Sequence, residues 1–89
     1  MPLSPVQKQD IIKEFQTADG DTGSPEVQIA LLTHRINALV DHLKKHAHDM
    51  HSRRGLLSMI AKRRRLINFL DKTDKIRATE ILQKMGLKN

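Results

Sequence analysis

Hydrophobic residues recur along the chain at intervals of three and four residues, and no segment shows the alternation of an exposed strand. The clearest run consists of Ile29, Leu32, Ile36, Leu39 and Leu43. Because this spacing puts all five side chains on one side of a helix, it predicts a long helix whose apolar seam packs against a partner. Ser24 and Pro25 mark its start, since serine is a favoured N-cap and proline fits the first turn.

A second long helix is predicted after a polar break at residues 46–52, where the apolar periodicity lapses. One arc of this helix carries six apolar side chains: Leu56, Met59, Ile60, Leu66, Ile67 and Leu70. Arg63 falls inside the same arc, so we expect its aliphatic stem to pack there while its guanidinium reaches outward.

Shorter helices are predicted at both ends of the chain. The first begins at a capping box formed by Ser4 and Gln7. The last begins at a cap at Thr73-Asp74 and ends at Gly86, since glycine readily adopts the left-handed conformation that stops a helix. The pattern therefore predicts an all-α fold of four helices, in which the two long middle helices are antiparallel.

Composition narrows the possible functions. The chain has 89 residues, the size of one small domain, so residues 1–89 are expected to fold as a unit. With two Phe and no Trp or Tyr, the core must be a thin aliphatic layer that leaves little room for an enclosed active site. The absence of Cys excludes disulfides and thiol catalysis. No apolar run approaches the roughly 18 residues of a membrane span, so we expect a small soluble protein of a reducing compartment.

The positive charge is concentrated in the later part of the chain. Residues 1–29 carry two Lys against five acids, whereas residues 30–89 carry 14 basic against five acidic side chains. This asymmetry is typical of nucleic-acid binding, although an anionic membrane would attract it too and a solvated face without a partner would look the same. Six basic residues of the second long helix are candidates for phosphate contacts: Arg53, Arg54, Lys62, Arg64, Arg65 and Lys72.

Three polar residues are expected to form a strip along the first long helix. Gln28, Arg35 and His42 lie seven residues apart, which is about 20° short of two helical turns, and Thr22 and Gly23 lie just before the strip. An amide, a guanidinium and an imidazole suit contacts with the 2′-hydroxyl groups, phosphates and base edges of RNA. An ordinary polar helix flank would show the same spacing, and this alternative stays open.

Asp49 is the only acid between His42 and Arg65, the most basic part of the chain. Because a carboxylate repels phosphate, its presence in a segment expected to bind nucleic acid requires an explanation. Asp49, followed by Ser52, could accept a hydrogen bond from the guanine amino group in the shallow minor groove of A-form RNA. Either residue could instead be the N-cap of the following helix. Both roles can hold together.

Catalytic and metal-binding interpretations find little support in the sequence. His42 and His46 form an i, i+4 pair, but a catalytic zinc site needs three protein ligands and H-E-x-x-H is absent. There is no P-loop, G-x-G-x-x-G or nucleophile elbow, so no enzyme, cofactor or metal is expected.

Two Phe, one of them expected in the core, cannot form a base-stacking platform for single-stranded nucleic acid. A folded RNA is therefore the partner that best fits the sequence. The alternatives are that the protein is a regulator that binds duplex DNA, or a basic protein that binds an anionic membrane.

The segment that starts at Leu39 reads L-V-D-H-L, five residues, Asp49, two residues, Ser52, three residues, Leu56, nine residues, Leu66, two residues and Phe69. This pattern resembles the signature of small-subunit ribosomal protein fifteen, in its bacterial and organellar form. The runs D-T-G-S-P-E-V-Q and H-S-R-R-G-L-L are similar to that family as well. The resemblance covers essentially the whole chain.

The resemblance implies a primary ribosomal-RNA-binding protein of the small-subunit platform. It would be monomeric when free and bound to cytoplasmic ribosomes of bacterial type, or to organellar ones. It would hold a three-way junction in the central domain of the RNA, allow neighbouring platform proteins to join, and bridge to large-subunit RNA.

The resemblance also implies two sets of RNA contacts. One set grips the junction, and its positions hold Thr22, Gly23, Gln28, Arg35 and Phe69. The other reads the shallow groove of a neighbouring helix at a G·U/G·C step, and its positions hold His42, Asp49 and Ser52. Family members often have Tyr at position 69, so a contact through that hydroxyl is absent here.

Overall fold

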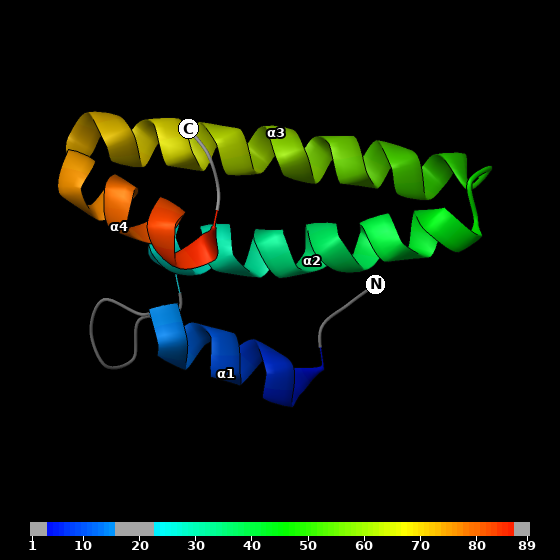
Figure 1. The fold of residues 1–89 in the computed structure, drawn as a ribbon, viewed down its shortest axis with the longest axis horizontal. Helices are drawn as coiled ribbons and strands as arrows, with labels where there is room; N and C mark the ends of the chain where they lie inside the picture. The colour runs from blue at the N-terminus through cyan, green and yellow to red at the C-terminus, as the bar shows by residue number, and fades with distance from the viewer. Residues whose placement is uncertain (1–3, 16–22, 87–89) are drawn as a thin grey trace.

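The computed structural model describes residues 4–15 and 23–86. These residues form four α-helices: α1 (Pro5–Phe15), α2 (Pro25–Lys45), α3 (Met50–Thr73) and α4 (Lys75–Met85). The long helices α2 and α3 lie antiparallel side by side, α4 folds back from the end of α3 toward the start of α2, and α1 packs along α2 (Figure 1). The predicted all-α fold, with two long antiparallel middle helices and short end helices, is confirmed.

The predicted caps at Ser4, Ser24 and Gly86 are present in the structure. Ser4 and Gln7 complete a capping box: the Ser4 N–H donates to Gln7 Oε1, and the Gln7 N–H donates to Ser4 Oγ, each at 3.1 Å. Ser24 Oγ accepts from the Val27 N–H at 3.3 Å at the start of α2. Gly86 ends α4 with φ at 68°, in the left-handed region that glycine adopts without strain.

The break between the long helices is shorter than predicted, spanning residues 46–49 instead of 46–52. The physical reason is that Asp49 already caps α3, because its Oδ1 accepts a hydrogen bond from the Ser52 N–H at 3.1 Å. The N-cap interpretation of Asp49 is therefore confirmed. Both long helices consequently extend to the turn that joins them.

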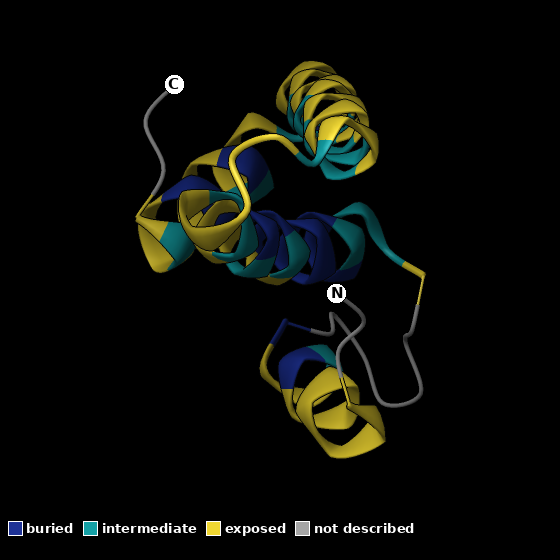
Figure 2. Cartoon of the chain, turned by 90° about the vertical axis from the view of Figure 1, so that its right-hand side faces the viewer, coloured by how far each residue is buried: buried dark blue, intermediate teal, exposed yellow. Residues whose placement is uncertain are grey.

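The hydrophobic core lies where the other three helices meet the first half of α2, and Figure 2 shows the buried residues concentrated there. Its buried members are Ile11, Phe15, Val27, Ile29, Ala30, Leu31, Leu70, Ala78 and Ile81. Farther along α2, Ile36 and Leu39 remain buried, while Leu43 near the turn is only half-buried. The end of the α2–α3 hairpin at the turn extends beyond α1 and α4 (Figure 1), so polar contacts have a larger share in holding it.

The guanidinium of Arg63 does not reach outward as expected. Its Nη1 donates to Thr33 Oγ1 of α2 at 3.3 Å, and burial lowers the pKa of Arg63. The hydroxyl of buried Thr33 donates its hydrogen to the Ile29 carbonyl at 2.8 Å and so keeps its lone pairs available as acceptors. This buried acceptor within reach of the arginine explains why the side chain turns across the helix interface.

Candidate nucleic-acid interface

The turn between α2 and α3 brings the three expected shallow-groove residues into one hydrogen-bonded cluster. We name His42, Asp49 and Ser52 the tip cluster. Asp49 Oδ2 accepts from Ser52 Oγ at 2.6 Å and lies 2.9 Å from His42 Nε2. Because an ionised carboxylate can only accept, His42 Nε2 carries the hydrogen of this bond. Hydrogen bonds from the Ser52 hydroxyl, His42 and the Ser52 N–H hold the pKa of Asp49 well below its usual range.

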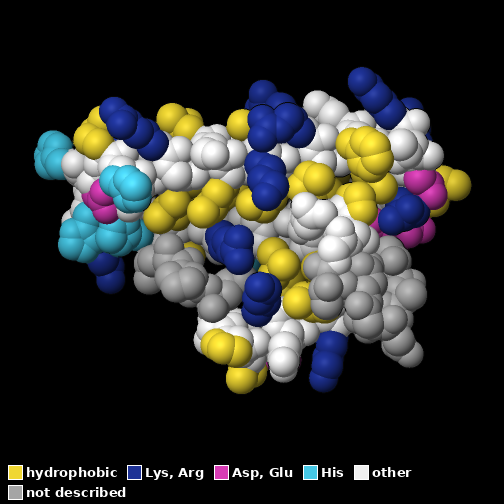
Figure 3. All heavy atoms as spheres, turned by 180° about the vertical axis from the view of Figure 1, so that it is seen from behind, with side chains coloured by type: hydrophobic (Ala, Val, Ile, Leu, Met, Phe, Trp, Pro, Cys, Tyr) yellow, Lys and Arg dark blue, Asp and Glu magenta, His cyan; other side chains and the backbone are white. Residues whose placement is uncertain are grey.

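The tip cluster therefore presents a fixed negative charge among basic and imidazole groups. Figure 3 shows His side chains gathered around an acidic one at this end of the molecule. The ring of His46 lies 4.7 Å from that of His42, centroid to centroid. Arg53 Nε donates to the Ala47 carbonyl at 2.8 Å and so holds the turn against α3. Asp49 Oδ1 accepts a single bond from the described residues, which leaves it able to accept another.

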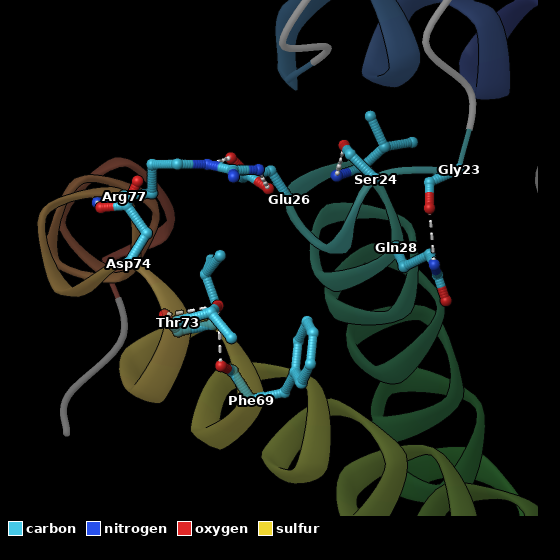
Figure 4. A network of polar contacts seen from close by, with 10 residues as sticks. Gly23, Ser24, Glu26, Gln28, Phe69, Thr73, Asp74 and Arg77 are labelled. Carbon is cyan, nitrogen blue, oxygen red and sulfur yellow. Dashed lines mark hydrogen bonds and ion pairs between the residues drawn. The ribbon is translucent and has the colours of Figure 1, made fainter.

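Most residues of the expected junction set lie at the opposite end of α2. Gln28 Nε2 donates to the Gly23 carbonyl at 2.8 Å, and no described residue donates to Gln28 Oε1 (Figure 4). Phe69 on α3 is 56% exposed, and its ring points toward the first turns of α2 (Figure 4). Thr22 lies outside the described residues. At the start of α2 the fold thus brings an amide and an exposed aromatic ring onto one part of the surface.

Arg35 lies midway between these two ends. Because α2 runs without interruption from Pro25 to Lys45, the seven-residue spacing places Gln28, Arg35 and His42 along one strip, as predicted. All three side chains are half-buried. The guanidinium of Arg35 pairs with no described residue, which leaves its donors available to an acceptor outside the protein.

The six phosphate-contact candidates are all exposed on α3, and Figure 3 shows basic side chains along this helix: Arg53, Arg54, Lys62, Arg64, Arg65 and Lys72. They do not share one line. At 100° per residue, Arg54, Arg65 and Lys72 fall within about 20° of one another, whereas Lys62 lies on one flank and Arg64 on the other. The positive surface of α3 therefore covers a broad arc.

The described part of the chain has a shallow surface hollow but neither a candidate metal site nor a membrane-spanning helix. A shallow hollow beside the turn is lined mainly by apolar side chains: Val40, Leu43, Lys44, Arg53, Leu56 and Leu57. Residues 4–15 and 23–86 contain no group of three acids or histidines placed to hold a metal ion. Their helices are each too short or too polar to cross a bilayer.

An ion pair that sequence reasoning did not find ties α2 to α4. Arg77 donates through Nε to Glu26 Oε2 and through Nη2 to Glu26 Oε1, both at 2.6 Å (Figure 4). The two residues are 51 positions apart, so no local pattern pairs them. The Glu26 side chain is only 10% exposed, which makes this pair part of the framework of the interface.

Comparison with known proteins shows to which family the chain belongs. The sequence model of the family described as "Ribosomal protein S15" matches residues 8–88. The chain belongs to the ribosomal protein S15 family. Among similar proteins, the "Small ribosomal subunit protein uS15" of Aquifex aeolicus (strain VF5) is 56% identical over 88 residues, which cover 99% of this chain and 98% of the relative. The protein of the same name from Parafrankia sp. (strain EAN1pec) is 54% identical and matched over 99% of both chains.

Membership of the S15 family confirms the resemblance found in the sequence. The chain is a structural constituent of the small ribosomal subunit, of bacterial type, and not an enzyme. Its partners are accordingly components of that subunit. In the S15 fold seen here, α2 carries Gln28 of the junction set near its start and His42 of the tip cluster near its end.

Proposed function

We propose that this S15-family protein binds small-subunit ribosomal RNA at a three-way junction, using both ends of its α2–α3 hairpin. The observation that carries the proposal is that one continuous helix, α2, carries members of both sets, with Gln28 near its start and His42 near its end. His42 follows Gln28 by 14 residues, which corresponds to about 21 Å along α2. Because a packed helix fixes this separation, contacts at both ends would hold two RNA arms in one relative arrangement.

The junction set suits the backbone and sugars of RNA. Gln28 Oε1 can accept from a 2′-hydroxyl, and the free donors of Arg35 can grip a phosphate. The exposed ring of Phe69 can pack on a sugar or a base. Gly23 is exposed, and the space where a Cβ would lie is open, so RNA can approach the backbone there. Thr22, the preceding residue, completes the proposed set.

The tip cluster suits the shallow groove of an RNA helix. Asp49 stays ionised and is held in place by Ser52 and His42, so it can accept from a guanine amino group without first reorganising. Guanine is the only base that shows a donor in the minor groove. Asp49 would therefore favour a groove with guanine at this position, while the basic residues of α3 contact phosphates on either side.

A junction held in one arrangement has consequences for the ribosome. We propose that the single domain formed by residues 1–89 binds as a monomer and fixes the junction in the central domain of the RNA, so that neighbouring platform proteins can join. A contact with large-subunit RNA, forming an intersubunit bridge, completes the proposed function. The proposed location is the cytoplasmic ribosome of a bacterial-type system.

Electrophoretic mobility shifts over a range of salt concentrations test this proposal. The probes are a folded three-way-junction RNA, a DNA duplex of matched length and anionic lipid vesicles. We expect binding to the junction RNA that persists at salt concentrations where binding to the other two is lost, because generic phosphate attraction is screened while specific contacts remain. Equal binding to RNA and DNA would favour the duplex-DNA regulator, and stronger binding to vesicles would favour the membrane alternative.

A further inference from the structure

A continuous series of contacts runs from Phe69 on α3 to the start of α2 by way of α4 (Figure 4). Thr73 Oγ1 donates to the Phe69 carbonyl at 3.0 Å. Asp74, the single residue between α3 and α4, caps both helices: its N–H donates to the Leu70 carbonyl at 2.7 Å, and its Oδ1 accepts from the Arg77 N–H at 3.2 Å. The end of α3 therefore determines where α4 begins and where Arg77 lies.

Arg77 continues this series across to α2. Its guanidinium grips the Glu26 carboxylate with two bonds of 2.6 Å, and this two-pronged geometry fixes the direction of the contact as well as its length. Glu26 is largely shielded from water and lies in the first turn of α2, where the helix dipole favours a negative charge. The pair therefore persists as a defined link between the two helices.

We propose that the Glu26–Arg77 pair sets the distance between the two halves of the junction set, and that Arg77 is a positioning residue for RNA binding. Glu26 lies between Gly23, which precedes the N-cap of α2, and Gln28 in the first turns of that helix, while Phe69 belongs to the end of α3 from which α4 departs. The contact between α2 and α4 is the least extensive of the helix contacts, so a pair of fixed geometry has a large share in holding it. This inference rests on the proposed function, since it concerns how that junction set is held.

The test uses the full-length Arg77→Lys variant, which keeps the charge but cannot form two parallel bonds. Its affinity is measured for two RNAs: the three-way junction, and a single RNA helix that offers only the guanine-bearing shallow groove. We expect weaker binding to the junction by about three- to tenfold, the range of a modest coupling between neighbouring residues, and unchanged binding to the single helix. Lys75→Arg, on the exposed face of α4, is the matched control and should leave both affinities unchanged.

A second arm of the test places Arg77→Lys in a Phe69→Leu background. There it should have no further effect on junction binding, because one half of the set is already lost. Equal weakening on both RNAs, which indicates partial unfolding, or undiminished junction binding would overturn the inference. If Arg77→Lys does not fold, Glu26→Asp, which withdraws the carboxylate by one methylene, replaces it in every comparison. A wild-type protein that shows no preference for the junction RNA would contradict the proposed function itself.

Discussion

His42 Nε2 lies 2.9 Å from Asp49 Oδ2, so the last turn of α2 is hydrogen-bonded to the residue that caps α3. The same carboxylate accepts from the hydroxyl and the N–H of Ser52. One side chain therefore starts a helix and also closes the hairpin, at the end that the core does not reach. Capping uses one lone pair of Asp49 Oδ1 and leaves another, so the confirmed cap and the proposed contact with guanine are compatible.

The low pKa of Asp49 predicts a loss of stability in acid. The unfolded carboxyl, with a pKa of about 4, binds a proton more readily than the folded one, so the stabilisation is present above that pH and is lost as the pH falls. Urea unfolding between pH 3 and pH 6 should show a shallower pH dependence for Asp49→Asn than for the wild type. Asp41→Asn, an exposed change on α2, is the charge-matched control. If the stability of the wild type and that of Asp49→Asn depended on pH in the same way, the stabilising role given to the ionised Asp49 carboxylate would be contradicted.

Asp49→Asn also separates specific recognition from general attraction. Asn caps a helix about as well as Asp. If Asp49 only caps α3, the Asp49→Asn variant should therefore bind RNA as tightly as the wild type, or more tightly because a negative charge has been removed. If Asp49 accepts from guanine, we expect affinity to fall by about tenfold, and the loss to shrink when inosine, which lacks the amino group, replaces that guanine. Titrations of both proteins against both RNAs measure this coupling. The control variant Asp41→Asn should show no coupling to the guanine amino group.

The salt dependence of RNA binding should depend on the basic surface of α3. Each phosphate contact contributes about 0.7–0.9 to the slope of log affinity against log salt. Replacing both Arg64 and Arg65 by Gln should therefore flatten the slope by about one to two units. Lys8→Gln with Lys13→Gln removes the same charge from exposed positions of α1, a helix that carries none of the candidate contact residues. A slope that changes equally in the two double variants would mean that only net charge matters.

Gln28→Ala and Arg35→Ala should weaken junction binding while the protein stays folded. Both side chains lie beside the apolar seam and not within it, so stability should change by no more than about 0.5 kcal/mol. Asn37→Ala, exposed on another face of α2, is the control for both measurements. Circular dichroism melting and RNA titration distinguish the outcomes, because a large fall in melting temperature would make these residues structural.

Gly55→Ala should stabilise the protein by about 1 kcal/mol, since alanine is the better helix former inside α3. A Cβ at this position would lie 3.9 Å from Leu39 Cδ2, an ordinary van der Waals contact. Urea unfolding at neutral pH measures the gain. Ser58→Ala, exposed on the same helix, should gain less, because serine already disfavours the helix less than glycine does. A loss of stability would show that the long helices cannot accommodate a methyl group here.

The sequence alone determined the four helices and most of their ends. A cap such as Ser24 or Gly86 acts on backbone groups within a few residues, so its effect can be recognised locally. The strip of Gln28, Arg35 and His42 was predictable for the same reason, because an unbroken helix fixes the direction of every seventh residue. The family resemblance likewise depended on spacing along the chain.

Only the tertiary structure decided which distant side chains meet. Arg63 was expected to point outward, yet it bonds to Thr33, 30 residues away, and Arg77 grips Glu26, 51 residues away. Lys84 of α4 similarly lies over the ring of Phe15, 4.5 Å from its centre. Such pairs depend on the angles and distances at which the helices pack, and these follow from the whole core. Neither hydrophobic periodicity nor local spacing contains that information, so the link between the two halves of the junction set emerged only with the fold.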